Sequence, residues 1–250
     1  MKWWAFTKRN LLETIRDPLS LVFCFLFPMM IFLIFQVVSL SIKGSAQYVP
    51  QFQTEALFIT VPQFAFTFLM LFVALLVSKD RSTAFLTRLR TTPMKSKDFI
   101  IGYALATIPL GLGQIVIISL LAICFGLKFT ANSLLAMVCE IPSMLMFIGL
   151  GLLLGSSLND KAVGGISSGL ITISTFLSGM FMSPEAMVEG FQIAMKVLPF
   201  YNSNIMASNA NYAVYSGSWV WEPIAIVFAY LVIFYSLAII VFSKKMKADA

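Results

Sequence analysis

The sequence has no histidine and only 11% charged residues, and these shortages exclude several classes of protein. Without a histidine base, the G-x-S-x-G pattern at residues 165–169 does not indicate a serine hydrolase. Paired acidic residues placed for catalysis are also missing, which argues against an intramembrane enzyme. No G-x-x-x-x-G-K-[ST] loop occurs, so the chain is not expected to hydrolyse ATP by itself.

Cysteine is equally scarce. Cys24, Cys124 and Cys139 all lie in apolar runs and show no C-x-x-C spacing. This distribution predicts small packing residues rather than a disulfide framework or a zinc site. No metal site is therefore expected.

Long apolar runs are abundant, because hydrophobic residues make up 59% of the chain and the mean hydropathy is +0.91. A membrane-spanning helix needs about 20 apolar residues. Six charge-free intervals are long enough, at residues 18–42, 56–78, 99–127, 141–159, 162–184 and 223–243. The sequence therefore predicts an all-α integral membrane protein with six transmembrane helices, forming one domain over residues 1–250.

The positive charges predict the orientation of these spans. With a cytoplasmic N-terminus, the inner segments hold 14 of the 17 Lys and Arg residues, and the outer loops hold only Lys43, Lys128 and Lys196. Positive charge gathers on the cytoplasmic side of membrane proteins. We therefore expect a cell-membrane protein with both termini in the cytoplasm. The net charge of +6 then indicates that the basic segments contact the anionic lipids of the inner leaflet, and it does not indicate binding to nucleic acid.

Residues 1–17 precede the first span and are amphipathic. In a helix over residues 2–16, apolar residues share one face and charged residues share the other. The apolar face holds Trp3, Trp4, Leu11, Leu12 and Ile15, and the charged face holds Lys2, Arg9, Glu13 and Arg16. This pattern predicts a helix that lies in the inner membrane interface. The alternative is an ordinary positively charged flank.

Residues 79–98 form a polar segment between two apolar runs and hold six of the Lys and Arg residues. A helix over residues 80–91 would place Phe85, Leu86 and Leu89 on one side, before Pro93 ends it. A basic helix with a narrow apolar stripe suits a groove on a cytoplasmic partner. The alternative is a solvated loop that binds only anionic lipid headgroups.

Three features of the second half complete the prediction. Glu140 is placed at the outer rim, because residues 141–159 suffice to span the membrane. The G-x-x-x-G spacings at 151–155 and 165–169 predict close helix packing. In the external segment 183–222, a helix is expected from Pro184 to Leu198, capped by Ser183 and lying on or dipping into the outer leaflet.

The order of these features resembles the membrane subunits of ABC-2 type exporters, also called type V or ABCG-like. The resemblance covers nearly the whole chain. The most specific pieces are Asp80-Arg81, Arg88-Leu89-Arg90-Thr91-Thr92-Pro93, Ser178-Gly179 with Pro184, and Leu198-Pro199-Phe200-Tyr201. The chain departs from the family pattern at Ser82, Ala84 and Val188, where an acidic residue, a glycine and a proline are usual.

The resemblance implies that the second-loop helix docks on a separate ATPase subunit, which binds the ATP. The coupling residues would be Phe85, Leu86, Arg88, Leu89 and Arg90. It also implies a re-entrant external segment, a second permease subunit, identical or similar, and a substrate path along spans one, two and five.

On spans two and five the candidate path residues are Gln63, Thr67, Thr172 and Phe176. A few polar groups on apolar walls suit an amphipathic or hydrophobic substrate, such as a drug, an antibiotic or a lipid-like molecule. Ordinary helix packing explains each residue equally well, and export of polysaccharide or metal ions stays open. The alternative function is an ion- or proton-coupled secondary carrier, which usually needs ionisable groups near the midplane.

Overall fold

The computed structural model describes residues 2–42, 50–82, 95–182, 184–214 and 218–248, and the regular structure in these ranges is helical throughout. The helices are α1 (Lys2–Arg16), α2 (Pro18–Leu21), the π-helical turn η1 (Val22–Leu26), α3 (Phe27–Ile42), the 3₁₀ turn η2 (Pro50–Phe52), α4 (Thr54–Ser82), α6 (Ser96–Cys124), α7 (Ala131–Ser157), α8 (Asp160–Leu177), the 3₁₀ turn η3 (Pro184–Ala186), α9 (Glu189–Val197), α10 (Pro199–Asn211) and α11 (Ser218–Ala248).

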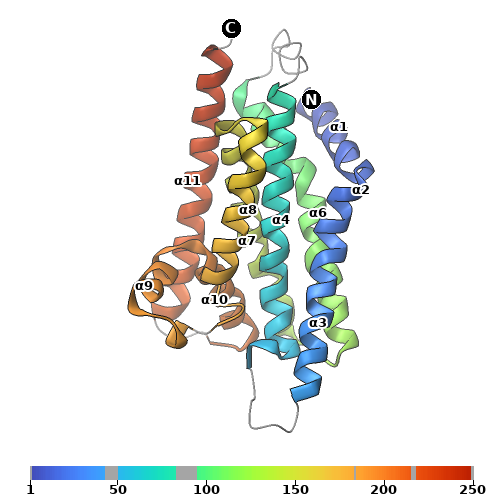
Figure 1. Cartoon of the computed structure of the whole chain (residues 1–250), viewed down its shortest axis with the longest axis vertical. Helices are drawn as coiled ribbons and strands as arrows, with labels where there is room; N and C mark the ends of the chain where they lie inside the picture. Colours follow the sequence, from blue (N-terminus) through green and yellow to red (C-terminus); the bar gives the residue numbers. More distant parts are fainter. Residues whose placement is uncertain (1, 43–49, 83–94, 183, 215–217, 249–250) are drawn as a thin grey trace.

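The long helices run side by side along one axis (Figure 1). Both ends of the chain lie at the same end of this bundle, together with α1, whereas α9 and α10 lie at the opposite end beside α11 (Figure 1). Helix α4 is the centre of the bundle and contacts α3, α6, α7, α8 and α10. Most of its side chains are buried.

Among the described residues, five helices are long and apolar enough to cross a membrane. They span Pro18–Ser41, Thr54–Ser82, Ser96–Cys124, Ala131–Ser157 and Trp221–Lys245. Helix α8 has 18 residues, begins with Asp160 and Lys161, and is not among the five. The all-α membrane fold is therefore confirmed, and a sixth span through α8 stays a prediction.

Helix α1 forms over the predicted residues and packs on α6. Its Phe6 ring meets the rings of Phe99 and Tyr103 edge to face, with ring centroids 5.4 and 4.8 Å away. The predicted apolar face points elsewhere, since Trp4 and Ile15 are exposed. Exposed apolar side chains are expected on a helix that contacts lipid.

The first span contains a π-helical turn, and a proline explains part of it. Pro28 has no N–H, so the carbonyl of Cys24 four residues earlier lacks its usual helical donor. The side chain of Gln114 on α6 supplies the donor, because its Nε2 donates to the Cys24 carbonyl at 2.8 Å and to the Ala65 carbonyl at 3.2 Å. One buried amide thus joins α6 to the first span and to α4.

The glycines at 151 and 155 pack against α4 as predicted. A Cβ on Gly151 would lie 2.5 Å from the Met70 carbonyl oxygen, and a Cβ on Gly155 would lie 2.6 Å from that of Ala74. No side chain fits between these backbones. The glycines at 165 and 169 differ, because a Cβ there would meet nothing within 4 Å in the described part of the chain.

The predicted starts of the fourth span and of the external helix were wrong. The fourth span starts at Ala131 rather than at residue 141, so Glu140 lies inside α7 and is buried. The external helix does not start at Pro184: a 3₁₀ turn ends at Ala186, and α9 begins after Val188, whose backbone is extended. Glu140 is buried because it bonds to Gln63 of α4, a contact that the charge pattern does not reveal. The extended backbone at Val188 separates the 3₁₀ turn from α9, although Ser183 and Pro184 favour a helix start.

The Asn-rich stretch that follows forms α10, which the sequence did not predict. Pro199 stands at its first position, where a missing N–H costs nothing. Asn202 then donates through Nδ2 to the carbonyls of Lys196 and Leu198, at 2.9 and 2.7 Å. This side chain satisfies carbonyls that the end of α9 leaves free, and so fixes the turn between α9 and α10.

Candidate functional site

The predicted coupling segment emerges from the ends of α4 and α6. Residues 79–82 form the last turn of α4 and residues 96–98 the first turn of α6, so the connection is shorter than predicted. The proposed docking residues Phe85, Leu86, Arg88, Leu89 and Arg90 lie outside the described residues. The structure describes the helix ends to which they are attached, at the same end of the bundle as α1 (Figure 1).

Asp80 is the centre of this region. Its side chain is only 3% exposed, and both carboxylate oxygens accept bonds from the Arg9 guanidinium, at 2.6 and 3.0 Å. The Tyr103 hydroxyl donates to the same carboxylate at 2.9 Å. Asp80 therefore joins α4 to α1 and α6 through charge-assisted hydrogen bonds.

The pKa of Arg9 reflects these contacts. Burial lowers the pKa of the guanidinium, but the hydrogen bond and charge of Asp80, with the charge of Glu13, more than offset burial and raise it above its ordinary value. Arg9 is therefore permanently charged, and Asp80 has a fixed cationic partner.

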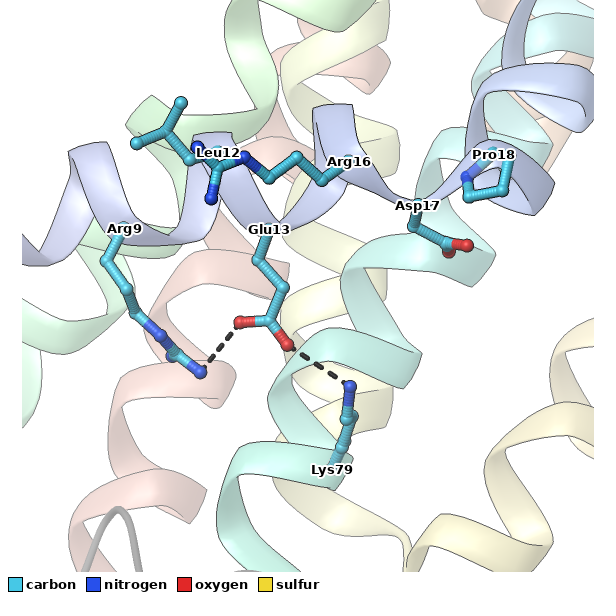
Figure 2. Close-up of a pocket in the computed structure, with 7 residues that line it drawn as sticks. All are labelled: Arg9, Leu12, Glu13, Arg16, Asp17, Pro18 and Lys79. Atoms are coloured by element: carbon cyan, nitrogen blue, oxygen red, sulfur yellow. Dashed lines mark hydrogen bonds and ion pairs between the residues drawn. The ribbon is translucent and has the colours of Figure 1, made fainter.

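Glu13 extends the contact between α1 and α4. It lies between Arg9, at 2.7 Å, and Lys79, at 3.2 Å. Figure 2 shows this bridge, with the Glu13 carboxylate pointing from α1 toward α4 while Arg16 extends along α1 toward Leu12. These residues line an open hollow of about 700 Å³ between α1 and the end of α4. The Lys79 side chain is 63% exposed, so this outer pair is weaker than the buried Asp80 pair.

The next residue, Arg81, binds the C-terminal end of α7. Its Nη1 donates to the carbonyls of Gly155 and Leu158, at 2.7 and 3.0 Å. Lys245 on α11 donates to the Ser157 carbonyl. Cations favour the negative end of a helix dipole. Both side chains therefore satisfy carbonyls that the end of α7 leaves free.

A further bond reaches α8, because the Ser78 hydroxyl donates to Asp160 at 3.1 Å. The end of α4, over residues 78–82, is thus bonded to α1, α6, α7 and α8. A displacement of the connection at residues 83–94 would act on this turn first. The bonded contacts would pass such a displacement to the neighbouring helices.

The candidate substrate-path residues fall into two groups. Gln63 and Thr67 on α4 are buried inside the chain, where the Gln63 amide donates to Glu140 of α7 and the Thr67 hydroxyl donates to the Phe64 carbonyl. Thr172 and Phe176 on α8 are exposed and line one groove together. The structure brings the α8 pair together and separates it from the α4 pair.

The groove beside Thr172 and Phe176 has a volume of about 800 Å³. It lies between α8, the turn after it and α9. Nearly all of its lining is apolar: besides Thr172 and Phe176 it comprises Ile173, Leu177, Met182, Ala186, Met187, Val188, Gly190, Phe191 and Ala194. Such a surface suits a hydrophobic molecule.

Sequence reasoning missed the burial of Asp80 and the pairing of Gln63 with Glu140. Asp80 was expected at the start of the predicted helix over residues 80–91, although its position between Lys79 and Arg81 was a usable signal. In the part of the chain that the structure describes, no three His, Cys, Asp or Glu residues are grouped to hold a metal ion.

A comparison with protein families matches residues 1–210 to the family described as ABC-2 type transporter. The match includes α1, the turn with Asp80, the α7 and α8 pair, and nearly all of α10. No curated protein matches the chain.

Proposed function

Because the chain belongs to the ABC-2 type transporter family, we propose that it is the membrane subunit of an ATP-driven exporter of amphipathic or hydrophobic molecules. Membership makes the chain a transport permease that relies on an ABC ATPase. Export, the class of substrate and the docking residues are our proposal. In it, a partner ATPase binds ATP and presses on the segment at residues 83–94.

The observation that carries this proposal is the bonded last turn of α4. Asp80 and Arg81 follow each other in sequence, yet they bind different helices, α1 and α7. A loop that only contacted lipid headgroups would not need Asp80, a buried carboxylate that accepts three hydrogen bonds at the end of the helix before the loop. A force applied beyond Ser82 would reach both sides of the bundle.

The apolar groove on α8 supports a hydrophobic substrate. Thr172 offers one hydroxyl among apolar side chains, and Phe176 offers an aromatic ring that is 48% exposed. On the same face the glycines at 165 and 169 have open space above them. We propose that this face of α8, with the first span, turns toward a second permease subunit, and that substrate passes between the two.

Helix α8 would then be the fifth of six spans, with both termini in the cytoplasm. Single cysteines at Lys161 and Glu189, in a chain without its three native cysteines, test this topology. Both side chains are exposed: Lys161 lies in the first turn of α8, and Glu189 begins α9, which follows it. We expect Lys161→Cys to react with an impermeant thiol reagent only from the cytoplasmic side and Glu189→Cys only from outside. Labelling of both from one side would contradict the sixth span.

The coupling proposal is tested by Leu89→Asp. If Phe85, Leu86 and Leu89 enter a groove on the ATPase, a charge at 89 should cost several kcal/mol from lost apolar area and desolvation. Copurification of the ATPase should weaken by about a hundredfold, since about 1.4 kcal/mol is tenfold. Thr91→Asp adds the same charge on the opposite predicted face and serves as the control. Normal docking and export by Leu89→Asp would refute the docking face.

One observation favours a second candidate function, a proton- or ion-coupled carrier. Glu140 is buried within α7 and bonded to Gln63, as the carboxyls of such carriers often are. Glu140→Gln separates the two functions. An ATP-driven exporter should keep ATP-dependent transport in this variant, whereas a carrier should lose transport driven by an ion gradient in vesicles without ATP.

A further inference from the structure

A hollow of about 260 Å³ lies between the start of α4, the turn after α8 and one side of α10. It is at the end of the bundle away from the chain termini (Figure 1). Tyr201, Asn204 and Ser208 line it from α10, and their spacing of three and four residues places them on one face of that helix. The groove on α8 and the contacts around Asp80 do not involve these residues.

Two pieces of sequence that carry the family resemblance meet at this hollow. Gly179 has a φ of +79°, which favours glycine, and a Cβ there would lie 3.1 Å from the Tyr201 ring. The Asn204 amide donates to the Ser178 carbonyl at 2.7 Å. The turn after α8 and the start of α10 are therefore fitted to each other, which fixes where Tyr201 and Asn204 stand.

The lining offers hydrogen bonds without charge. Asn204 is 6% exposed, and its Oδ1 has no hydrogen-bond partner among the described residues. A buried acceptor without a donor is unfavourable, so a donor in the hollow would stabilise this oxygen once a small shift of the lining exposes it. Gln51, Thr60 and Ser208 add an amide and two hydroxyls, and none of the residues that line the hollow is charged.

Two aromatic rings complete the site. Tyr201 and Tyr212 both line the hollow, and each combines an apolar ring with a hydroxyl. Burial, with a smaller contribution from the Glu185 carboxylate, raises the pKa of Tyr201. Its hydroxyl therefore stays protonated at neutral pH and can donate.

We propose that this hollow binds an uncharged, polyhydroxylated group of the size of one sugar ring. The hydroxyls of such a ring can donate to Asn204 and accept from Tyr201, and its C–H face can pack on a tyrosine ring. A charged group would lose hydration without gaining a counter-charge. The volume is below the range of roughly 300–1,000 Å³ that is typical of drug-sized ligands, which favours a small group.

The inference rests on the proposed export function, because the bound group would be the polar head of an exported amphiphile. The headgroup of a membrane glycolipid offers the same chemistry. The experiment therefore measures binding directly, with the full chain in lipid nanodiscs and without ATPase or ATP. The probe is methyl β-D-glucopyranoside, followed by saturation-transfer NMR, and methyl β-D-glucuronide is the matched charged probe.

We expect saturable binding of the glucoside in the millimolar range and binding of the glucuronide at least about tenfold weaker. Tyr201→Phe keeps the ring and removes one donor, so it should weaken glucoside binding about threefold to tenfold. Asn204→Leu should abolish binding, although it also loses the bond to Ser178 and needs a check of folding. Tyr230→Phe, on α11 and away from the hollow, is the control and should leave binding unchanged.

Absence of saturable glucoside binding would overturn the proposal. Equal affinity of the Tyr201→Phe variant and the unmodified protein for the glucoside would also overturn it. Nanodiscs that contain monoglucosyl diacylglycerol distinguish the two sources. Loss of the glucoside signal there assigns the site to a lipid headgroup, and persistence assigns it to a group that arrives with the substrate. Failed export in cells with intact glucoside binding would contradict the proposed function and leave this site standing.

Discussion

Replacing Asp80 by asparagine tests whether the last turn of α4 depends on its contact with α1. The substitution keeps the size of the side chain and removes its charge. One of the two oxygens becomes an NH₂ group, which cannot accept a bond from Arg9 or Tyr103. The guanidinium then loses the carboxylate that binds it at 2.6 and 3.0 Å.

The expected cost follows from the burial of the pair. Breaking a buried ion pair costs about 3–5 kcal/mol. The Arg9 side chain is 35% exposed and keeps Glu13 at 2.7 Å, so part of this cost is recovered through water and the second carboxylate. We therefore expect a loss of about 2 kcal/mol, which corresponds to roughly a 30-fold decrease in the equilibrium constant for docking of α1.

A double-mutant cycle between Asp80→Asn and Arg9→Gln measures this interaction. The free energy of unfolding of the purified chain is compared for both single variants and the double variant, and ATP-dependent export is measured at matched protein levels. The double variant should be less destabilised than the sum of the single variants by about 2 kcal/mol. Lys79→Gln is the control, because an exposed pair contributes only about 0–1 kcal/mol.

Additive effects, within about 0.5 kcal/mol, would refute the interaction between Asp80 and Arg9. If the coupling energy is present but export is unchanged, the contact stabilises the fold and does not transmit movement. Export lost in Asp80→Asn and restored when Arg9→Gln is added would instead show that an unpaired guanidinium, rather than the missing carboxylate, disturbs the site.

Two further substitutions test the packing of the bundle. Gly151→Leu should lower the melting temperature by several degrees, because a side chain there meets the α4 backbone and overpacking costs about 1–3 kcal/mol. Gly164→Ala is the control and should be neutral or stabilising, because there is open space around its Cβ. Equal changes in melting temperature for the two variants would contradict the close approach of α7 to α4. Gln114→Leu removes a donor from the carbonyl of Cys24, so it should destabilise the chain by about 1–3 kcal/mol, and an unchanged melting temperature would count against this bond.

The sequence predicted the long helices well, because an apolar run between charges is itself the physical requirement for a membrane span. Helix α1 was equally predictable from its two faces. Its buried side was not, since Phe6 and its neighbours contact a helix about ninety residues later in the chain. Local periodicity reveals which faces differ, and it carries no information about distant partners.

The errors concern polar residues that tertiary contacts bury. Asp80 and Glu140 were placed in a cytoplasmic segment and at a rim because a charged residue marks the end of an apolar run. Their partners Arg9 and Gln63 lie about seventy residues away in the sequence. Helix α10 was missed because asparagine favours turns over helices. The hydrogen bonds of Asn202 to the preceding helix outweigh that preference.

The π-helical turn at residues 22–26 determines how the first span can change in length. The buried positions Ser20, Cys24, Pro28, Phe32 and Gln36 recur every four residues. At about 100° per residue, sixteen residues of regular α-helix would rotate this seam by about 160°, and the extra residue of the π turn reduces the rotation to about 60°. Deleting one residue within this turn would therefore leave a regular α-helix with the same rotation of about 60°, so α1, with Arg9, would keep its orientation relative to α3. A one-residue deletion there should be far better tolerated than one elsewhere in the first span, where it would rotate the two ends by about 100° relative to each other.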